Sequence, residues 1–227
     1  IVNFADRYLI TGLIGPIKQE FGLGDGLIGL VMGPAFVVLY VIMGVPLARM
    51  ADRGSRIRII ALGCLAWSVA TIGTGLAIGP VSLVLARICV GVGEAAFVAP
   101  AYSLLTDYFR PERRGVAFAV MGFATYAGQI LGQGGGPMLA QVEGWRFAFW
   151  TMGACGLVLG AIALFAIREP TREKQGEAAH LPFRGLLSLF TGSRAAVLIT
   201  GSMSFGMLSG VAFGYWGPEL FTRAYGI

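Results

Sequence analysis

Long apolar stretches dominate the chain, separated by short polar or glycine- and proline-containing breaks. A helix that spans a bilayer needs about 20 mostly apolar residues. Seven windows are long enough, at residues 1–21, 26–50, 57–78, 81–108, 115–141, 146–167 and 195–222. The pattern therefore predicts seven membrane-spanning helices. Because the first window opens at Ile1 without a methionine or a basic region, we also expect further residues upstream.

The composition agrees with a membrane protein. Of the 227 residues, 56% are hydrophobic and 13% are charged, against roughly a quarter charged in soluble domains. The three cysteines lie in apolar windows without a second cysteine or histidine at metal-ligand spacing, so we expect neither a metal site nor a disulfide. The net charge of +5 is spread over short loops, which argues against a nucleic-acid partner. An all-α polytopic membrane protein is predicted.

Lysine and arginine residues are distributed unevenly between the loops, and short cytoplasmic loops carry an excess of them. Twelve of the 17 basic residues follow the second, fourth and sixth windows: Arg49, Arg53, Arg56, Arg58, Arg110, Arg113, Arg114, Arg168, Arg172, Lys174, Arg184 and Arg194. The even-numbered helices are therefore predicted to end in the cytoplasm. The N-terminus and the linker would then lie on the cytoplasmic side of the cell inner (plasma) membrane.

The charge pattern also divides the chain. Residues 1–167 are predicted to form an N-terminal bundle of six transmembrane helices, and residues 168–194 a cytoplasmic linker. The linker turns apolar over residues 181–190, which favours a helix in the membrane interface. Residues 195–227 would contain the seventh helix. His180, the single histidine of the chain, lies in the polar part of the linker and is assigned no role.

Four charged side chains stand out because they lie deep inside the predicted helices, away from the window ends: Asp6, Arg7, Arg87 and Glu94. Each costs about 2.5 to 3.5 kcal/mol at the bilayer centre, so such residues persist where protein or water solvates them. With a rise of about 1.5 Å per residue, Arg7 and Glu94 are predicted to meet near the midplane. Arg87 and Glu94 are seven residues apart and therefore share one helix face. The four charges sum to zero when all are ionised.

Two interpretations of these charges stay open. Arg7 and Glu94 either form a pair that only locks two helices, or belong to a site that binds a substrate. Asp6 fits the locking interpretation less well, because neighbouring Arg7 points about 100° away around the helix. We therefore expect Asp6 and Glu94 to be proton-coupling residues, with Asp6 as the first choice.

Several short motifs follow one another along the chain. They are Asp-Arg-Gly-Ser-Arg at 52–56, Arg87 with Gly91, Gly93 and Glu94, DYFRPERRG at 107–115, Gly128, Gly132 and Gly136 before Pro137, and Gly-Trp-Arg-Phe at 144–147. Glycines at four-residue spacing let two helices approach closely, as a static packing face or as part of a moving one.

With these motifs in this order, the chain resembles the major facilitator superfamily over essentially its whole length. Residues 3–8 and 91–95 resemble the bacterial relatives of the Spinster transporters, whose eukaryotic members export sphingosine phosphate and other lysolipids. The resemblance implies twelve helices in two six-helix halves. We expect this chain to hold the N-terminal half, a linker and a seventh helix, with the rest absent. Ala140 and Gln141 replace the usual trailing glycine pair, which weakens an expectation of antiport.

The resemblance and the charges together predict a cytoplasmic gate made of Asp52, Arg53, Arg56, Asp107 and Arg114. Asp52 precedes a helix whose positive N-terminal end favours a negative charge, and Arg53 and Arg56 are expected to pair with Asp107. Alternatively, these charges only set the topology and form solvated pairs worth under about 1 kcal/mol each.

We expect a secondary active transporter that works by alternating access and is proton-coupled. Its substrate would be amphipathic and anionic or zwitterionic, such as a lysolipid or a sphingoid phosphate. Substrate binding is assigned to Arg7, Arg87, Glu94, Tyr126 and Gln129, since the planar fork of arginine binds phosphate or carboxylate in a bidentate manner. No cofactor is expected besides the proton as coupling ion. The expected partners are the substrate and membrane lipid, around a monomer.

A drug or organic-anion permease of the same superfamily is the main alternative, and a channel is a further one. A seven-helix receptor with bound retinal is disfavoured because residues 195–222 contain no lysine for a Schiff base. An enzyme is not expected, because the chain lacks a Ser/His/Asp arrangement and a zinc-binding HExxH motif.

Overall fold

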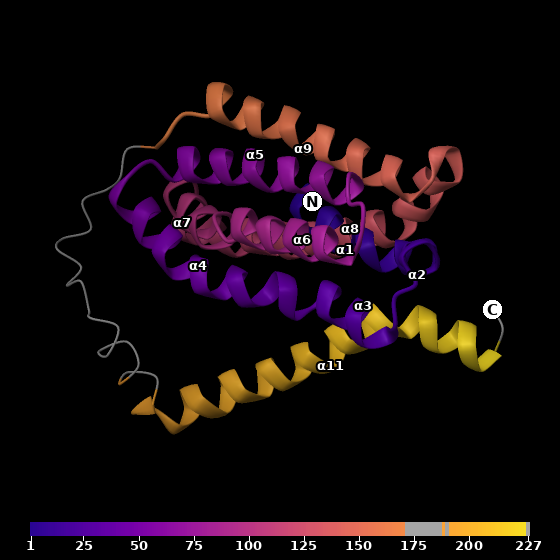
Figure 1. Ribbon diagram of the computed structural model, residues 1–227. Helices are drawn as coiled ribbons and strands as arrows, with labels where there is room; N and C mark the ends of the chain where they lie inside the picture. Colours follow the sequence, from indigo (N-terminus) through magenta and orange to yellow (C-terminus); the bar gives the residue numbers. More distant parts are fainter. Residues whose placement is uncertain (171–187, 189–190, 226–227) are drawn as a thin grey trace. The chain divides into compact units, whose positions relative to one another are not determined.

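The computed structural model describes residues 1–170, 188 and 191–225 (Figure 1). Within these ranges the chain forms helices and no strand, which confirms the predicted all-α architecture. The chain divides into two compact units, residues 1–172 and 173–227. The predicted interfacial helix at 181–190 lies outside the described residues, apart from Ser188.

The helices of the first unit follow one another with short connections. They are α1 (Val2–Leu9), the 3₁₀ helix η1 (Ile10–Leu13), α2 (Ile14–Phe21), α3 (Asp25–Met32), α4 (Pro34–Arg53), α5 (Arg56–Gly75), α6 (Pro80–Glu94), α7 (Val98–Tyr108), α8 (Pro111–Glu143) and α9 (Trp145–Ala166). The second unit contains α11 (Arg194–Tyr225).

Six helical segments of the described chain are long and apolar enough to cross a membrane. They are Asp25–Arg53, Arg56–Gly75, Pro80–Tyr108, Pro111–Glu143, Trp145–Ala166 and Arg194–Gly217. Each coincides with one of the predicted windows from residue 26 onward. The first window is helical from Val2 to Phe21, but the 3₁₀ turn η1 divides it.

Proline accounts for the interruptions that the hydrophobic pattern did not predict. Pro16 has no amide hydrogen to bond the carbonyl of Gly12, so the chain tightens into a 3₁₀ turn there. Pro34 begins α4 directly after α3 ends. Pro100 leaves the carbonyl of Ala96 without its helical donor, and the helix is broken between α6 and α7.

The first helical segment lies in the core of its unit. Leu9, Ile10, Leu13 and Ile17 are at most 1% exposed. Helix α1 packs against α8 and α9, while α5 packs against α9 and α6, and α4 packs against α6. Figure 1 shows α5 and α9 running alongside each other. Charged residues on α1 and α6 are therefore held inside the bundle.

The glycine stripe of α8 permits the close approach of α1. A Cβ atom on Gly128 would lie 2.5 Å from the carbonyl oxygen of Ile1, and one on Gly132 would collide with the carbonyl of Ala5. Gly134, on another face of α8, has nothing within 4 Å of its Cβ position. The helix contact predicted from the glycine spacing is present, and its partner is the first helix.

Replacing Gly132 with alanine should therefore force α1 and α8 apart and destabilise the protein by about 1 to 3 kcal/mol, the usual cost of overpacking. The matched change Gly134→Ala should be neutral or slightly stabilising, because alanine favours the helix and meets no neighbour. Thermal unfolding of the two detergent-solubilised variants measures the difference. Equal melting temperatures would contradict the packing.

Candidate functional site

Arg7 of α1 and Glu94 of α6 form an ion pair inside the bundle. The Arg7 Nε and Nη2 atoms lie 3.0 and 2.6 Å from the same oxygen of Glu94, Oε2. The side chain of Glu94 is 0% exposed and that of Arg7 is 18% exposed. Glu94 is the last residue of α6, directly before the helix break. The predicted meeting of these two residues therefore occurs where the backbone is irregular.

Aromatic rings surround the guanidinium group of Arg7. Its central carbon lies 4.8 Å from the ring centre of Phe36, 4.9 Å from that of Tyr40 and 5.5 Å from that of Phe4. Cations over aromatic faces gain about 0.5 to 2 kcal/mol each, more when water is excluded. These rings hold Arg7 in place beside Glu94.

Arg87 of α6 is the cluster residue with the most unsatisfied hydrogen-bond donors. Its side chain is fully buried, and none of its three guanidinium nitrogens has a hydrogen-bond partner among the described residues. Its guanidinium carbon lies 5.4 Å from the ring centre of Phe36, which therefore stands against both arginines. A buried donor without an acceptor costs about 1 to 3 kcal/mol, and more when it is charged. Arg87 is thus ready to bind an acceptor.

Asp6 of α1 is 1% exposed and is held on one side only. Its Oδ2 atom accepts a hydrogen bond of 2.5 Å from the hydroxyl of Thr71 in α5. Its other oxygen, Oδ1, has no hydrogen-bond partner within the described part of the chain. Asp6 is close enough to Arg7, Arg87 and Glu94 to interact with their charges.

Two polar residues of the cluster were not predicted. Thr71 anchors Asp6, and Asn3, which is 3% exposed, lies one turn before Arg7 and close to Glu94. Both are polar residues within apolar windows, which is the signal that identified the four ions. Their lack of charge made them look like ordinary helix residues.

Tyr126 and Gln129 of α8 lie away from the ion cluster. Tyr126 is 69% exposed, Gln129 is partly buried, and neither bonds to the four ions within the described residues. Tyr126 lies near Tyr8 of α1, the residue after Arg7. The described part of the chain therefore shows no bond between these two predicted binding residues and the cluster.

A second ionic network joins the helix ends on the predicted cytoplasmic side. Arg56 begins α5 and is 2% exposed. It lies 2.5 Å from Oδ2 of Asp107 and 2.8 Å from Oε1 of Glu169, and its Nη1 donates to the hydroxyl of Ser103 at 3.0 Å. Arg56 thus connects α5 with α7 and with the residues after α9.

Glu169 is the member of this network that the motifs did not predict. Its Oε2 atom accepts hydrogen bonds from the Ser55 hydroxyl at 2.8 Å and from the Ile57 amide at 3.0 Å, at the N-terminus of α5. Partial burial alone would raise the pKa of Glu169, but these bonds and Arg56 outweigh it and lower the pKa below its usual value. Only the fold shows that a residue 113 positions after Arg56 reaches it.

The remaining predicted gate residues have other surroundings. Arg56, and not Arg53, pairs with Asp107. Asp52 and Arg53 are exposed at the end of α4. Arg114 donates to the carbonyls of Thr106 at 2.9 Å and Phe109 at 3.3 Å, so it caps the C-terminal end of α7.

Known proteins resemble the chain over most or all of its length. Residues 1–227 match the Major Facilitator Superfamily. A Mycolicibacterium smegmatis protein named MFS-type efflux pump is 36% identical over 167 residues, covering 73% of this chain and 39% of the relative. The sphingosine-1-phosphate transporter SPNS2 of Xenopus tropicalis is 30% identical over 237 residues, covering 99% of this chain and 44% of the relative. The chain spans less than half of these curated relatives.

A solved structure shares the arrangement of helices. It is a bacterial homologue of the human lysosomal transporter Spinster, in an inward-facing and unoccupied conformation. It matches with a TM-score of 0.84 and 29% identity, covering 100% of this chain and 54% of that chain.

The chain belongs to the Major Facilitator Superfamily. The predicted resemblance to this superfamily and to the Spinster transporters is therefore confirmed. These relatives are named as transporters or pumps and not as enzymes, in agreement with the prediction.

The lowered pKa of Glu169 gives the cytoplasmic network a pH dependence. Because the folded pKa lies below the ordinary value of 4.5, its bonds stabilise the protein fully above that value, and this contribution is lost as the pH falls through the folded pKa. Glu169→Gln should therefore lower stability by about 1 to 3 kcal/mol at neutral pH. The difference from the wild type should shrink as the pH falls below 4.5.

Melting temperatures measured from about pH 3 to about pH 7, with both proteins in the same detergent, test this effect. Glu143→Gln, at an exposed position at the end of α8, is the control and should match the wild type throughout. A constant gap between wild type and Glu169→Gln at every pH would contradict the assignment.

Proposed function

We propose that the protein is a secondary active transporter that works by alternating access and couples an amphipathic anionic or zwitterionic substrate to protons. The observation that carries this proposal is the buried cluster of Asp6, Arg7, Arg87 and Glu94. Two of its members lie on α6, which ends at Glu94 with an interruption of the spanning helix. Discontinuous membrane helices are the usual place for substrate and ion sites in secondary transporters.

Arg7 has an ion-pair partner and Arg87 has unsatisfied donors, so we assign the two arginines different roles. Arg7 is already held by Glu94 and by three aromatic rings, so it positions the carboxylate. Arg87 has unused donors and is therefore the residue to which we assign the anionic headgroup. The structural alternative, a pair that only locks α1 to α6, explains Arg7 and Glu94 but leaves Arg87 without a purpose.

Proton coupling follows from the charge balance of the cluster. With its four groups ionised the cluster is neutral, so an added anion favours a protonated carboxylate nearby, and by reciprocity the proton favours the anion. Asp6 is suited to this role because Oδ1 has no hydrogen-bond partner within the described residues. A substrate with an ammonium group would instead compete with the proton, so the headgroup decides between symport and exchange.

Two substrate classes fit the relatives. The name of the Xenopus relative favours a sphingoid phosphate, whose phosphate suits Arg87. The efflux pump of Mycolicibacterium smegmatis, at 36% identity, favours the second candidate, a drug or organic-anion permease. In either case, we expect the bonds of Arg56 to Asp107 and Glu169, which lie within the first unit, to hold its helix ends together while this half moves as one body. We place the protein in the cell inner membrane, as a monomer with the N-terminus and linker in the cytoplasm.

Exchanging Asp6 for asparagine tests the coupling. The whole protein, as its gene encodes it, is placed in proteoliposomes that contain a pH-sensitive dye, and sphingosine-1-phosphate is added outside. We expect the substrate to drive proton movement in the wild type and not in Asp6→Asn, because the amide does not titrate. Exchange of labelled substrate across the same membrane should persist in the variant.

Asp25→Asn makes the same chemical change at an exposed position and should couple like the wild type. Undiminished proton movement in Asp6→Asn would remove Asp6 from the mechanism. Flux driven by organic anions but not by lysolipids would select the permease alternative.

A further inference from the structure

The hydroxyl group of Thr71 lies between the ion cluster and the backbone of α5. Thr71 is fully buried, and its Oγ1 atom is 2.5 Å from Oδ2 of Asp6 and 2.9 Å from the carbonyl oxygen of Trp67. A hydroxyl group carries one proton, so it donates to one of these two acceptors at a time. The carbonyl of Trp67 has no proton to give. Which of the two bonds Thr71 donates therefore depends on the protonation of Asp6.

The two protonation states of Asp6 place the hydroxyl proton differently. An ionised carboxylate only accepts hydrogen bonds, so Thr71 must donate to Asp6 in that state. A protonated Asp6 donates through Oδ2 to Oγ1 of Thr71, which leaves the hydroxyl proton free to bond the carbonyl of Trp67. We propose that Thr71 is a positioning residue that passes the protonation of Asp6 to the backbone of α5 at Trp67. This inference rests on the proposed proton coupling through Asp6.

The backbone at Trp67 lies against the end of α6, where Glu94 is placed. A Cβ atom on Gly93 would lie 2.6 Å from the amide nitrogen of Trp67, so the two helices meet at their backbones. The ring of Trp67 meets that of Phe97, in the break between α6 and α7, edge to face at 6.0 Å. A threonine hydroxyl that bonds the carbonyl one turn earlier commonly bends a helix. A bend of α5 at Trp67 would therefore reach the segment that carries Glu94.

The other charged or titratable groups near Asp6 come from three helices. The described groups that act electrostatically on Asp6 are Arg7 of α1, Arg87 and Glu94 of α6, and Cys64 of α5. Helix α8 approaches α1 through glycines, and the charged residue of α9, Arg146, is paired with Glu20. Within the described residues, Thr71 is the hydrogen-bond partner of Asp6, so the relay begins there.

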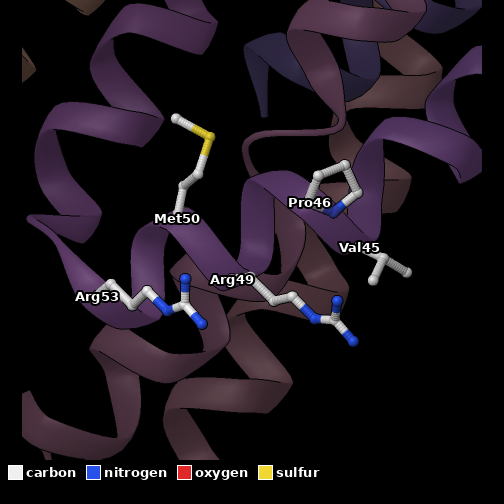
Figure 2. Close-up of a pocket in the computed structure, with 5 residues that line it drawn as sticks. All are labelled: Val45, Pro46, Arg49, Met50 and Arg53. Atoms are coloured by element: carbon white, nitrogen blue, oxygen red, sulfur yellow. The ribbon is translucent and has the colours of Figure 1, made fainter. Parts of the chain in front are cut away.

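The proposed relay consists of buried residues and is separate from the surface of α4. A hollow of about 260 Å³ lies there, lined by Val45, Pro46, Arg49, Met50 and Arg53 (Figure 2). None of these residues takes part in the contacts among Asp6, Thr71 and Trp67.

Infrared difference spectroscopy of the whole protein, labelled with carbon-13 at the tryptophan carbonyls, tests the relay. The band of Trp67 is identified by its absence in Trp67→Phe, and the carboxyl band of Asp6 by its absence in Asp6→Asn. In the wild type both bands should change with pH at one shared midpoint. In Thr71→Val and Thr71→Ala, Asp6 should still titrate, but the pH-dependent shift of the Trp67 band should be lost. Thr71→Ser keeps a hydroxyl group and should retain the shift.

The matched control is Thr74→Val, one turn later on α5. Thr74 is also fully buried, and its hydroxyl donates to the carbonyl of Ala70 at 3.1 Å, so the same chemical group is removed away from Asp6. This variant should keep the wild-type response of Trp67, and melting temperatures check that each variant is folded.

Two results would overturn the relay: a Trp67 band that shifts with pH in Thr71→Val as it does in the wild type, or one that does not shift in the wild type. Either result leaves the proposed function standing if substrate-driven proton movement is still lost in Asp6→Asn. A carboxyl band of Asp6 that does not titrate in the wild type would instead overturn the proposed coupling itself.

Discussion

The ion pair between Arg7 and Glu94 is the constraint on which the rest of the structure depends. A charge inside a bilayer must be matched by another charge or by water, and breaking such a pair by removing one partner commonly costs about 3 to 5 kcal/mol. The pair therefore fixes α1 against α6 in one register. The ring of Phe36 lies against the guanidinium groups of both Arg7 and Arg87, so one aromatic ring contacts the paired cation and the unpaired one.

The surrounding helices are arranged so that this pair is possible. Glycines on α8 bring the backbone of α1 into the core, and Pro100 contributes to the break at which Glu94 lies. Thr71 of α5 holds Asp6 from the other side. Close packing around α1 and an irregular backbone at the end of α6 together create a polar centre within an apolar bundle. The bonds of Arg56 hold helix ends together at a separate place in the same unit.

The sequence predicted the parts of this arrangement that depend on local pattern. The hydrophobic windows predicted the spanning helices. Charged residues inside these windows are a strong signal, and they identified Asp6, Arg7, Arg87 and Glu94. The helix breaks were missed because hydropathy does not register a lost backbone hydrogen bond. Glu169 was missed because its partners lie more than 110 positions away, and such pairing is a property of the folded chain. Arg53 and Arg56 were both expected to pair with Asp107, and the structure shows the pair with Arg56.

The central claim is that Arg87 is the headgroup ligand of a transport site and not a structural charge. Calorimetric titration of the whole protein with sphingosine-1-phosphate tests this most directly, with Arg87→Gln compared with the wild type and with the exposed control Arg110→Gln. The account predicts that affinity falls by about tenfold or more in Arg87→Gln and is unchanged in the control. A folded Arg87→Gln variant that binds the lipid as tightly as the wild type would contradict it.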